Sequence, residues 1–149
     1  MSLGGAAVSD EDADKFCVIV PAYREEGRIG PVVKSILKHA AHVVVVDDGS
    51  PDHTAAEAEK AGAVVIKHDV NKGKGIALDT GFDYARKNGF EFVITLDADG
   101  QHDPDEIPAF LDAYRQTGTP ALIGNRMDRP GAMPLVRRLT NRYMSWLLS

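Results

Sequence analysis

The sequence predicts an α/β fold built on a mostly parallel sheet with helices on both faces. Strand-like and helix-like segments alternate along the chain, and the strand-like segments are continuous apolar runs, such as FCVIVP and VVVVD. Strands that are covered on both faces read as unbroken apolar runs, whereas strands with one wet face alternate. The 149 residues, 44% of them hydrophobic, suit one domain with a real core.

Each element has a local signal, and the elements follow one another in a regular order. The segments at 16–21, 43–47, 63–67, 90–97 and 121–124 are apolar or β-branched and are expected to be strands. Apolar residues recur at helical spacing in the segments at 31–40, 54–61, 75–88, 104–116 and 135–148, which are expected to be helices. Prolines Pro31 and Pro104 fall in first turns, and Gly62 and Gly89 follow last turns, as is typical of helix ends.

Three regions are expected along the chain. Residues 1–15 are rich in glycine, alanine and acids and are predicted to be a flexible tail. Residues 16–134 hold the alternating elements and form the main domain. Residues 135–149 form a basic amphipathic helix that ends on Trp-Leu-Leu-Ser without a polar tail. We therefore expect the chain to be the N-terminal part of a longer protein.

Composition narrows the class of protein. A net charge of −5 gives no support for nucleic-acid binding. The single cysteine, Cys17, excludes an internal disulfide and lies in an apolar run, so a buried thiol is expected. The N-terminus does not have the pattern of a signal peptide, and no stretch approaches the ~20 apolar residues of a membrane span. These features favour a cytoplasmic protein.

Acidic residues follow two of the predicted strands. Asp47 and Asp48 end the second strand, and Asp97, Asp99 and Gln101 follow the fourth. Ligands of open α/β sheets bind beyond the carboxyl ends of the strands. Carboxylate and amide oxygens suit Mg²⁺ or Mn²⁺, although a solvated acidic turn explains the same residues. We expect the positive charge that relieves this crowding of carboxylates to arrive with the substrate.

Further residues support a phosphate ligand. The segment NKGKG at 71–75 opens a helix with glycines and two lysines, Lys72 and Lys74, which suits a diphosphate as well as a solvated turn. Tyr23 could stack on a nucleobase. Arg126 could pair with a phosphate or with an aspartate. For Ser50, capping of the following helix is the simpler role.

Two other features have competing readings. An EF-hand is excluded, because His102 stands where its loop needs glycine, and a structural role is expected for this histidine. The last helix carries Arg137, Arg138 and Arg142 beside aromatic and leucine residues. It could lie in a membrane interface or pack on a further domain, and both readings stay open.

Five segments in this order, VIVPAYREE, VVVVDDGSPDHT, NKGKGIALDTGF, VITLDADGQHDP and IGNRM, resemble the family 2 glycosyltransferases over nearly the whole chain from Phe16. The DADGQHDP and GNRM segments are most similar to the branch that transfers sugars to polyprenyl phosphates, such as the dolichol-phosphate mannosyltransferases. The resemblance implies the GT-A fold, a Rossmann-like mostly parallel sheet, with residues 16–134 as the nucleotide-sugar-binding domain.

The resemblance also implies a function and its residues. It implies an inverting, metal-dependent glycosyltransferase that moves a sugar from a GDP- or UDP-linked donor to an acceptor, a polyprenyl phosphate, with Mg²⁺ or Mn²⁺ as cofactor. Such an enzyme would work in the cytoplasm or peripherally on the cytoplasmic face of the membrane. The implied residues are, for catalysis, Asp97, Asp99 and Arg126; for the nucleotide-sugar, Pro21, Tyr23, Glu25, Asp47, Asp48, Lys72 and Lys74; for the metal, Asp97, Asp99 and Gln101; and for the acceptor phosphate, Arg126, Arg137 and Arg138.

Two alternatives belong to other classes. A receiver-like signalling domain also gathers acids and a lysine at strand ends and binds Mg²⁺, but its acid pair follows the first strand, where this chain has Pro21-Ala22-Tyr23. A stable aspartyl phosphate would identify that class. A non-catalytic nucleotide-sugar-binding module is the other alternative, and transfer activity separates it from an enzyme.

Overall fold

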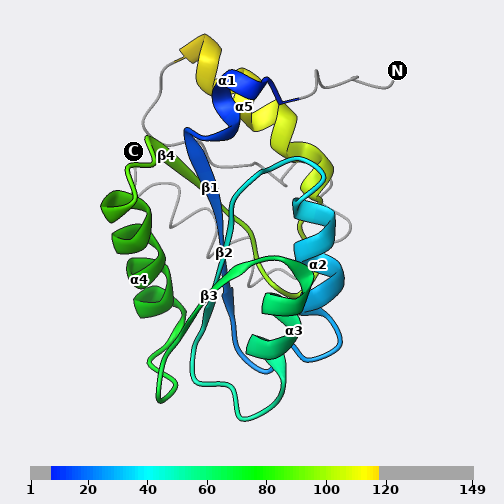
Figure 1. Ribbon diagram of the computed structural model, residues 1–149, viewed down its shortest axis with the longest axis vertical. Coiled ribbons are helices and arrows are strands. Elements are labelled where there is room, and N and C mark those ends of the chain that lie inside the picture. Colours follow the sequence, from blue (N-terminus) through cyan, green and yellow to red (C-terminus); the bar gives the residue numbers. More distant parts are fainter. Residues whose placement is uncertain (1–7, 118–149) are drawn as a thin grey trace, which may run out of the picture. The chain divides into compact units, whose positions relative to one another are not determined.

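A four-stranded parallel sheet forms the centre of the computed structural model, which describes residues 8–117 (Figure 1). Its strands stand in the order β3-β2-β1-β4. They are β1 (Phe16–Ala22), β2 (Val43–Asp47), β3 (Val64–Lys67) and β4 (Phe92–Thr95). The helical elements are α1 (Asp10–Ala13), α2 (Ile29–Ile36), α3 (Thr54–Ala61), α4 (Lys74–Lys87), the short 3-10 turn η1 (Pro104–Glu106) and α5 (Ile107–Thr117). The predicted α/β class and parallel sheet are confirmed.

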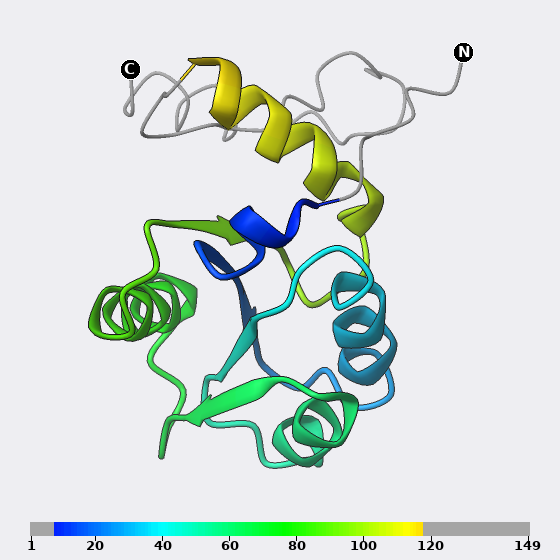
Figure 2. The same ribbon diagram turned by 45° about the horizontal axis from the view of Figure 1, so that its top comes forward.

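Helices cover both faces of this sheet. Figures 1 and 2 show α4 on one face and the pair α2 and α3 on the other. Side chains alternate between the two faces along β1, as the pleat of a strand requires. Phe16, Val18 and Val20 belong to the core under α2 and α3, whereas Cys17 and Ile19 belong to the core under α4. Because β1 is buried on both faces, its sequence is an unbroken apolar run.

Several predicted boundaries shift by a few residues. Helix α2 begins earlier than expected, because the N–H groups of Arg28 and Ile29 already donate to the carbonyl of Glu25. Strand β4 is shorter than predicted: the N–H of Phe90 still donates to Ala85 at the end of α4, and that of Asp97 turns to a side chain. The predicted strand at 121–124 and helix at 135–148 lie outside the described residues.

The chain before β1 is more ordered than the predicted tail. Residues 10–13 form the single turn α1, in which the hydroxyl of Ser9 donates to Asp12 (2.8 Å) and Lys15 pairs with the same carboxylate (3.4 Å). Val8 packs against the core. These contacts hold the segment from residue 8 onward in place.

The chain consists of two compact units, and the boundary between them follows Leu111. The first unit holds the sheet and the helices that pack on it, including the first residues of α5. The described part of the second unit is the end of α5, where Arg115 pairs with Asp112 (2.8 Å). No helix in the described part of the chain is long and apolar enough to cross a membrane.

All four strands end at the same edge of the sheet, because they are parallel. Strand β1 pairs with β2 and β4 on its two sides, and β2 pairs with β3. The loops that leave this edge are residues 23–28, 48–53, 68–73 and 96–103. Every described motif that the sequence singled out lies on one of these loops or next to it.

Candidate functional site

The loop after β1 is fastened to the segment that follows β2. The N–H of Arg24 donates to Oγ of Ser50 (2.9 Å), and the N–H of Glu25 donates to Oγ1 of Thr54 (2.9 Å). Arg24 has a φ of 55°, a left-handed conformation that costs a non-glycine residue roughly 1–3 kcal/mol. The two hydrogen bonds hold this strained turn, so the loop keeps one shape at the carboxyl edge.

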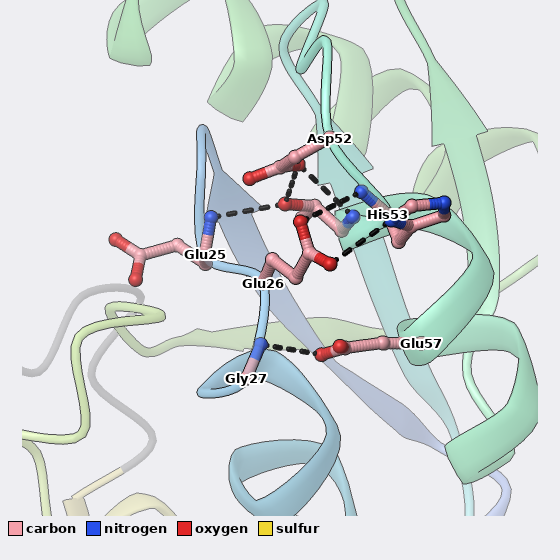
Figure 3. Close-up of polar contacts among 7 residues, drawn as sticks. Glu25, Glu26, Gly27, Asp52, His53 and Glu57 are labelled. Atoms are coloured by element: carbon pink, nitrogen blue, oxygen red, sulfur yellow. Dashed lines mark hydrogen bonds and ion pairs between the residues drawn. The ribbon is translucent and has the colours of Figure 1, made fainter.

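Acidic side chains complete this fastening (Figure 3). Glu26 accepts from the backbone N–H of His53 (3.3 Å) and contacts its Nδ1 (2.9 Å), while Glu57 accepts from the N–H of Gly27 (2.7 Å). Asp52 accepts from the hydroxyl and the N–H of Thr54, and the hydroxyl contact is the main reason that the pKa of Asp52 lies below its usual range. These carboxylates therefore serve the loop structure.

The neighbouring residues of the β2 loop differ from the simplest expectation. Ser50 does not cap α3, whose N-cap residue is His53. Its hydroxyl is used by Arg24 instead, and its N–H donates to Oδ1 of Asp47 (3.1 Å). The second oxygen of Asp47, Oδ2, is buried and has no hydrogen-bond partner among the described residues. Within the described part of the chain, Asp47 therefore holds the turn through its Oδ1 alone.

Asp48 is the most heavily bonded carboxylate of the site and is only 3% exposed. Its Oδ1 accepts from the N–H of Lys72 (2.9 Å) and contacts Nδ1 of His68 (2.7 Å), and its Oδ2 accepts from the N–H of Gly73 (2.8 Å). Burial by itself raises the pKa of Asp48, but the hydrogen bonds from His68, Lys72 and Gly73 outweigh it and hold this pKa below its usual range. The ionised Asp48 thus ties the β2 loop to the NKGKG segment at 71–75, the glycine-rich loop.

Gly49 brings the same two loops into direct backbone contact. A Cβ on this residue would lie 2.5 Å from the carbonyl carbon of Val70 and 2.6 Å from the nitrogen of Asn71. Its φ is +76°, a left-handed backbone conformation that residues with a Cβ rarely adopt. Glycine is therefore required here on two independent grounds, close approach and conformation.

The acidic loop after β4 is organised around Asp97. Lys74, from the first turn of α4, forms an ion pair with its Oδ1, and the N–H of Asp97 donates to Nδ1 of His102 (2.8 Å). Asp99 accepts from the N–H of Gln101 (2.9 Å), and Asp103 accepts from the N–H of Asp105 (2.9 Å) at the start of η1. The expectation that all the compensating charge arrives with a substrate needs correction, because Lys74 supplies part of it.

The contact between Lys74 and Asp97 joins the glycine-rich loop to the acidic loop. Both side chains are accessible, at 61% and 28% exposure. Exposed ion pairs contribute about 0–1 kcal/mol, so this pair can open to admit a ligand. Gly73 and Gly75 have open space where a Cβ would stand. The N-terminus of α4, a helix of 14 residues, therefore offers N–H groups and a lysine to an anion.

The donor set fits a hard divalent cation. Asp97 and Asp99 offer partly exposed carboxylates, and Gln101 is exposed in the same turn. Among residues 8–117, no three His, Cys, Asp or Glu side chains come together as a metal-binding group. Mg²⁺ is commonly held by one or two carboxylates, with water and substrate phosphates as its other ligands, and this set suits that pattern.

The remaining predicted residues fall in different places. Pro21 is half-buried at the end of β1, and Tyr23 is 40% exposed with the guanidinium of Arg24 5.3 Å from its ring centre. Glu25 pairs with Arg28 (2.9 Å). The predicted acceptor-site arginines, Arg126, Arg137 and Arg138, lie outside the described residues.

Sequence reasoning missed two residues of this edge. His68 directly follows β3, at the same carboxyl edge as the residues that were singled out, and it contacts Asp48. Thr80, on α4, lies 2.9 Å from the other ring nitrogen of His68. The position of His68 after a strand was a usable signal, whereas the role of Thr80 depends on where α4 packs.

Comparison with known proteins places the chain in a family. The family model described as glycosyl transferase family 2 matches residues 17–148. The chain is 33% identical to a UDP-N-acetylglucosamine–dolichyl-phosphate N-acetylglucosaminyltransferase of Methanococcus voltae, with 91% of this chain and 62% of that protein covered. It is 37% identical to a polyprenol monophosphomannose synthase of Mycolicibacterium smegmatis, with 88% and 55% covered. The chain thus spans little more than half the length of these relatives.

Solved structures agree with the sequence relatives. Glucosyl-3-phosphoglycerate synthase from Mycobacterium tuberculosis, crystallised with Mg²⁺ and uridine diphosphate, matches with a TM-score of 0.56 and 28% identity. This match covers 71% of the chain and 42% of the synthase. The fold is the GT-A fold, and a receiver-like domain is set aside. The chain belongs to glycosyl transferase family 2.

Proposed function

We propose that the chain binds a nucleoside-diphosphate sugar together with a divalent cation, and that it is the donor-binding part of an inverting glycosyltransferase whose acceptor is a polyprenyl phosphate. The observation that carries the proposal is the ion pair between Lys74 and Asp97. It brings the glycine-rich loop, which suits a phosphate, next to the loop of Asp97 and Asp99, which suits a divalent cation. A diphosphate bound to a cation needs both of these partners together.

Asp97 and Asp99 would hold the cation, with Gln101 beside them. When bound, Mg²⁺ or Mn²⁺ neutralises the charge that builds on the departing diphosphate. Lys74 would leave Asp97 for a phosphate oxygen, which costs little because the pair is exposed. The free N–H groups at the start of α4 would point at the same phosphates.

The nucleoside would lie over the loops after β1 and β2. Tyr23 is exposed enough to stack on a base, and Pro21 and Glu25 flank it. Asp47 keeps one buried acceptor without a partner among the described residues. Both oxygens of Asp48 accept N–H groups of the glycine-rich loop, so this carboxylate would support the phosphate site.

The acceptor is assigned from its chemistry and from the relatives' names. One relative is named a dolichyl-phosphate N-acetylglucosaminyltransferase and another a polyprenol monophosphomannose synthase. A phosphate acceptor is already anionic at neutral pH, so attack on the anomeric carbon needs no general base. Arg126, Arg137 and Arg138 would meet this phosphate, and the basic segment 135–149 would lie against the cytoplasmic membrane face.

Calorimetric titration tests the proposal. UDP, GDP and other nucleoside diphosphates are added to the chain with Mn²⁺, with Mg²⁺ and with a chelator. We expect one of them to bind with metal and to bind far more weakly with chelator. The absence of binding for every nucleotide with either metal would overturn the proposal. Transfer of labelled sugar to polyprenyl phosphate then separates an enzyme from a non-catalytic binding module.

A further inference from the structure

His68 occupies a buried position under the glycine-rich loop. It follows β3, and its N–H donates to the carbonyl of Asp47 (2.8 Å), which continues the pairing of β3 with β2 by one residue. The residue is 8% exposed. Its ring lies between Asp48, just after β2, and Thr80 on α4.

Both ring nitrogens of His68 have polar partners. Nδ1 lies 2.7 Å from Oδ1 of Asp48, and Nε2 lies 2.9 Å from Oγ1 of Thr80. Oγ1 of Thr80 also lies 3.0 Å from the carbonyl of Ile76, so its hydroxyl can donate to that carbonyl or to Nε2. An ionised carboxylate can only accept. The hydrogen in the contact with Asp48 therefore comes from Nδ1 of His68, whichever way the Thr80 hydroxyl points.

The contact between His68 and Asp48 links the ring to the glycine-rich loop. Oδ1 of Asp48 is shared between His68 and the N–H of Lys72, and Oδ2 accepts from the N–H of Gly73. The ring therefore fixes the rotation of the carboxylate, and the carboxylate fixes two consecutive backbone N–H groups. A buried carboxylate is stable when it is hydrogen-bonded, and the N–H of Nδ1 is one of the donors that satisfy Asp48.

We propose that His68, through a hydrogen bond from Nδ1, is a positioning residue of the donor site that orients Asp48 and through it sets the path of Lys72 and Gly73 at the entrance of α4. The role rests on the proposed function, because the loop matters as a diphosphate site. The ring of His68 is buried and contacts Asp48 directly, so we assign its effect on the donor site to Asp48.

Two substitutions separate the two ring nitrogens. The side-chain nitrogen of asparagine is three bonds from Cα, as Nδ1 of histidine is, and that of glutamine is four bonds away, as Nε2 is. His68→Asn therefore keeps a donor toward Asp48 and loses the contact to Thr80. His68→Gln keeps the contact to Thr80 and loses the donor toward Asp48. The pair is matched, since both variants replace the ring with a neutral amide.

The first readouts need no ligand. Nitrogen-15 NMR of the wild-type imidazole is expected to show a proton on Nδ1. Amide hydrogen exchange at Lys72 and Gly73 is expected to be slow in the wild type and in His68→Asn and faster in His68→Gln. A ring that carries its only proton on Nε2, or unchanged protection in a folded His68→Gln, would overturn the proposal. These readouts stand even if no nucleotide binds, so they are independent of the proposed function.

The third readout is affinity for the nucleoside diphosphate that binds the wild type. A charge-assisted hydrogen bond contributes enough that His68→Gln is expected to raise Kd by about 10- to 100-fold, with His68→Asn within about threefold of wild type. Equal losses in the two variants would contradict the role of Nδ1. If His68→Gln does not fold, Thr80→Val decides: it removes the hydroxyl that contacts Nε2 and Ile76 but leaves Nδ1 in place, so the protection of Lys72 and Gly73 is expected to stay, and its loss would contradict the role of Nδ1.

Discussion

Substitution of Gly49 by alanine tests the contact between the β2 loop and the glycine-rich loop. The left-handed backbone at φ +76° costs alanine roughly 1–2 kcal/mol. The new Cβ would also meet backbone atoms of Val70 and Asn71 at 2.5 and 2.6 Å, and overpacking of this kind costs roughly 1–3 kcal/mol. We expect Gly49→Ala to lower the free energy of unfolding by roughly 2–5 kcal/mol in total.

Gly89 offers a matched control. Its φ is +77°, and no atom lies within 4 Å of the position that a Cβ would take. Gly89→Ala should therefore show the conformational cost alone, roughly 1–2 kcal/mol. Urea unfolding of the wild type and the two variants measures both effects, and the difference between the variants isolates the close approach of the loops.

The two variants should also differ in function. Alanine at position 49 pushes residues 70–71 away and disturbs the N–H groups that Asp48 holds, so nucleoside-diphosphate affinity is expected to fall. Gly89→Ala should leave this affinity unchanged. If Gly49→Ala is no more destabilising than Gly89→Ala, the close packing of the two loops is refuted.

Three further predictions concern the fold and its buried groups. Gly81→Ala should destabilise the fold although alanine favours helices, because the new Cβ would lie 2.5 Å from Cγ2 of Ile19. Gly30→Ala has open space around the new Cβ and should stabilise the fold by up to about 1 kcal/mol. Thermal unfolding of both variants should show these opposite shifts. Burial raises the pKa of Cys17 to about 11, so its thiol should resist iodoacetamide in the folded chain and react in urea, and equal rates would contradict its burial. Because the pKa of Asp48 is lowered in the fold, its ionised form stabilises the fold at pH values above the ordinary pKa of 3.8, and this contribution is lost as the pH falls through the lower folded pKa. The difference in unfolding free energy between wild type and Asp48→Asn, measured by urea titration, should therefore shrink over that acidic range. A constant difference would mean that Asp48 is not hydrogen-bonded in the fold.

Local patterns predicted the elements well. The run VVVVD becomes β2 with the expected bounds, and Gly62 ends α3 in a left-handed conformation, as a helix-stop glycine does. Both outcomes depend on neighbours along the chain, which is why a single sequence is enough. The positions of the acidic residues also followed from the sequence, because parallel strands must end at one edge.

The pairing of groups across that edge could not be predicted. The contact between Lys74 and Asp97 joins residues 23 positions apart, and that between His68 and Asp48 joins residues 20 apart. Each contact depends on the strand order and on the path of the connecting loops. The pattern therefore marked these loops as a site, but it could not show that Asp48 also holds the glycine-rich loop, and it favoured a helix cap for Ser50, which instead accepts from Arg24.

The most direct test of the central claim compares two aspartates of one loop. Asp99→Asn removes a charge from the proposed metal pair and can keep the acceptor for the N–H of Gln101, whereas Asp103→Asn removes a charge at the start of η1 and can keep its cap. The measurement is the Mn²⁺-dependent affinity for the nucleoside diphosphate that binds the wild type. We expect it to fall at least about tenfold in Asp99→Asn and to stay near wild type in Asp103→Asn. Equal affinities in the two variants would contradict a metal–diphosphate site at the end of β4.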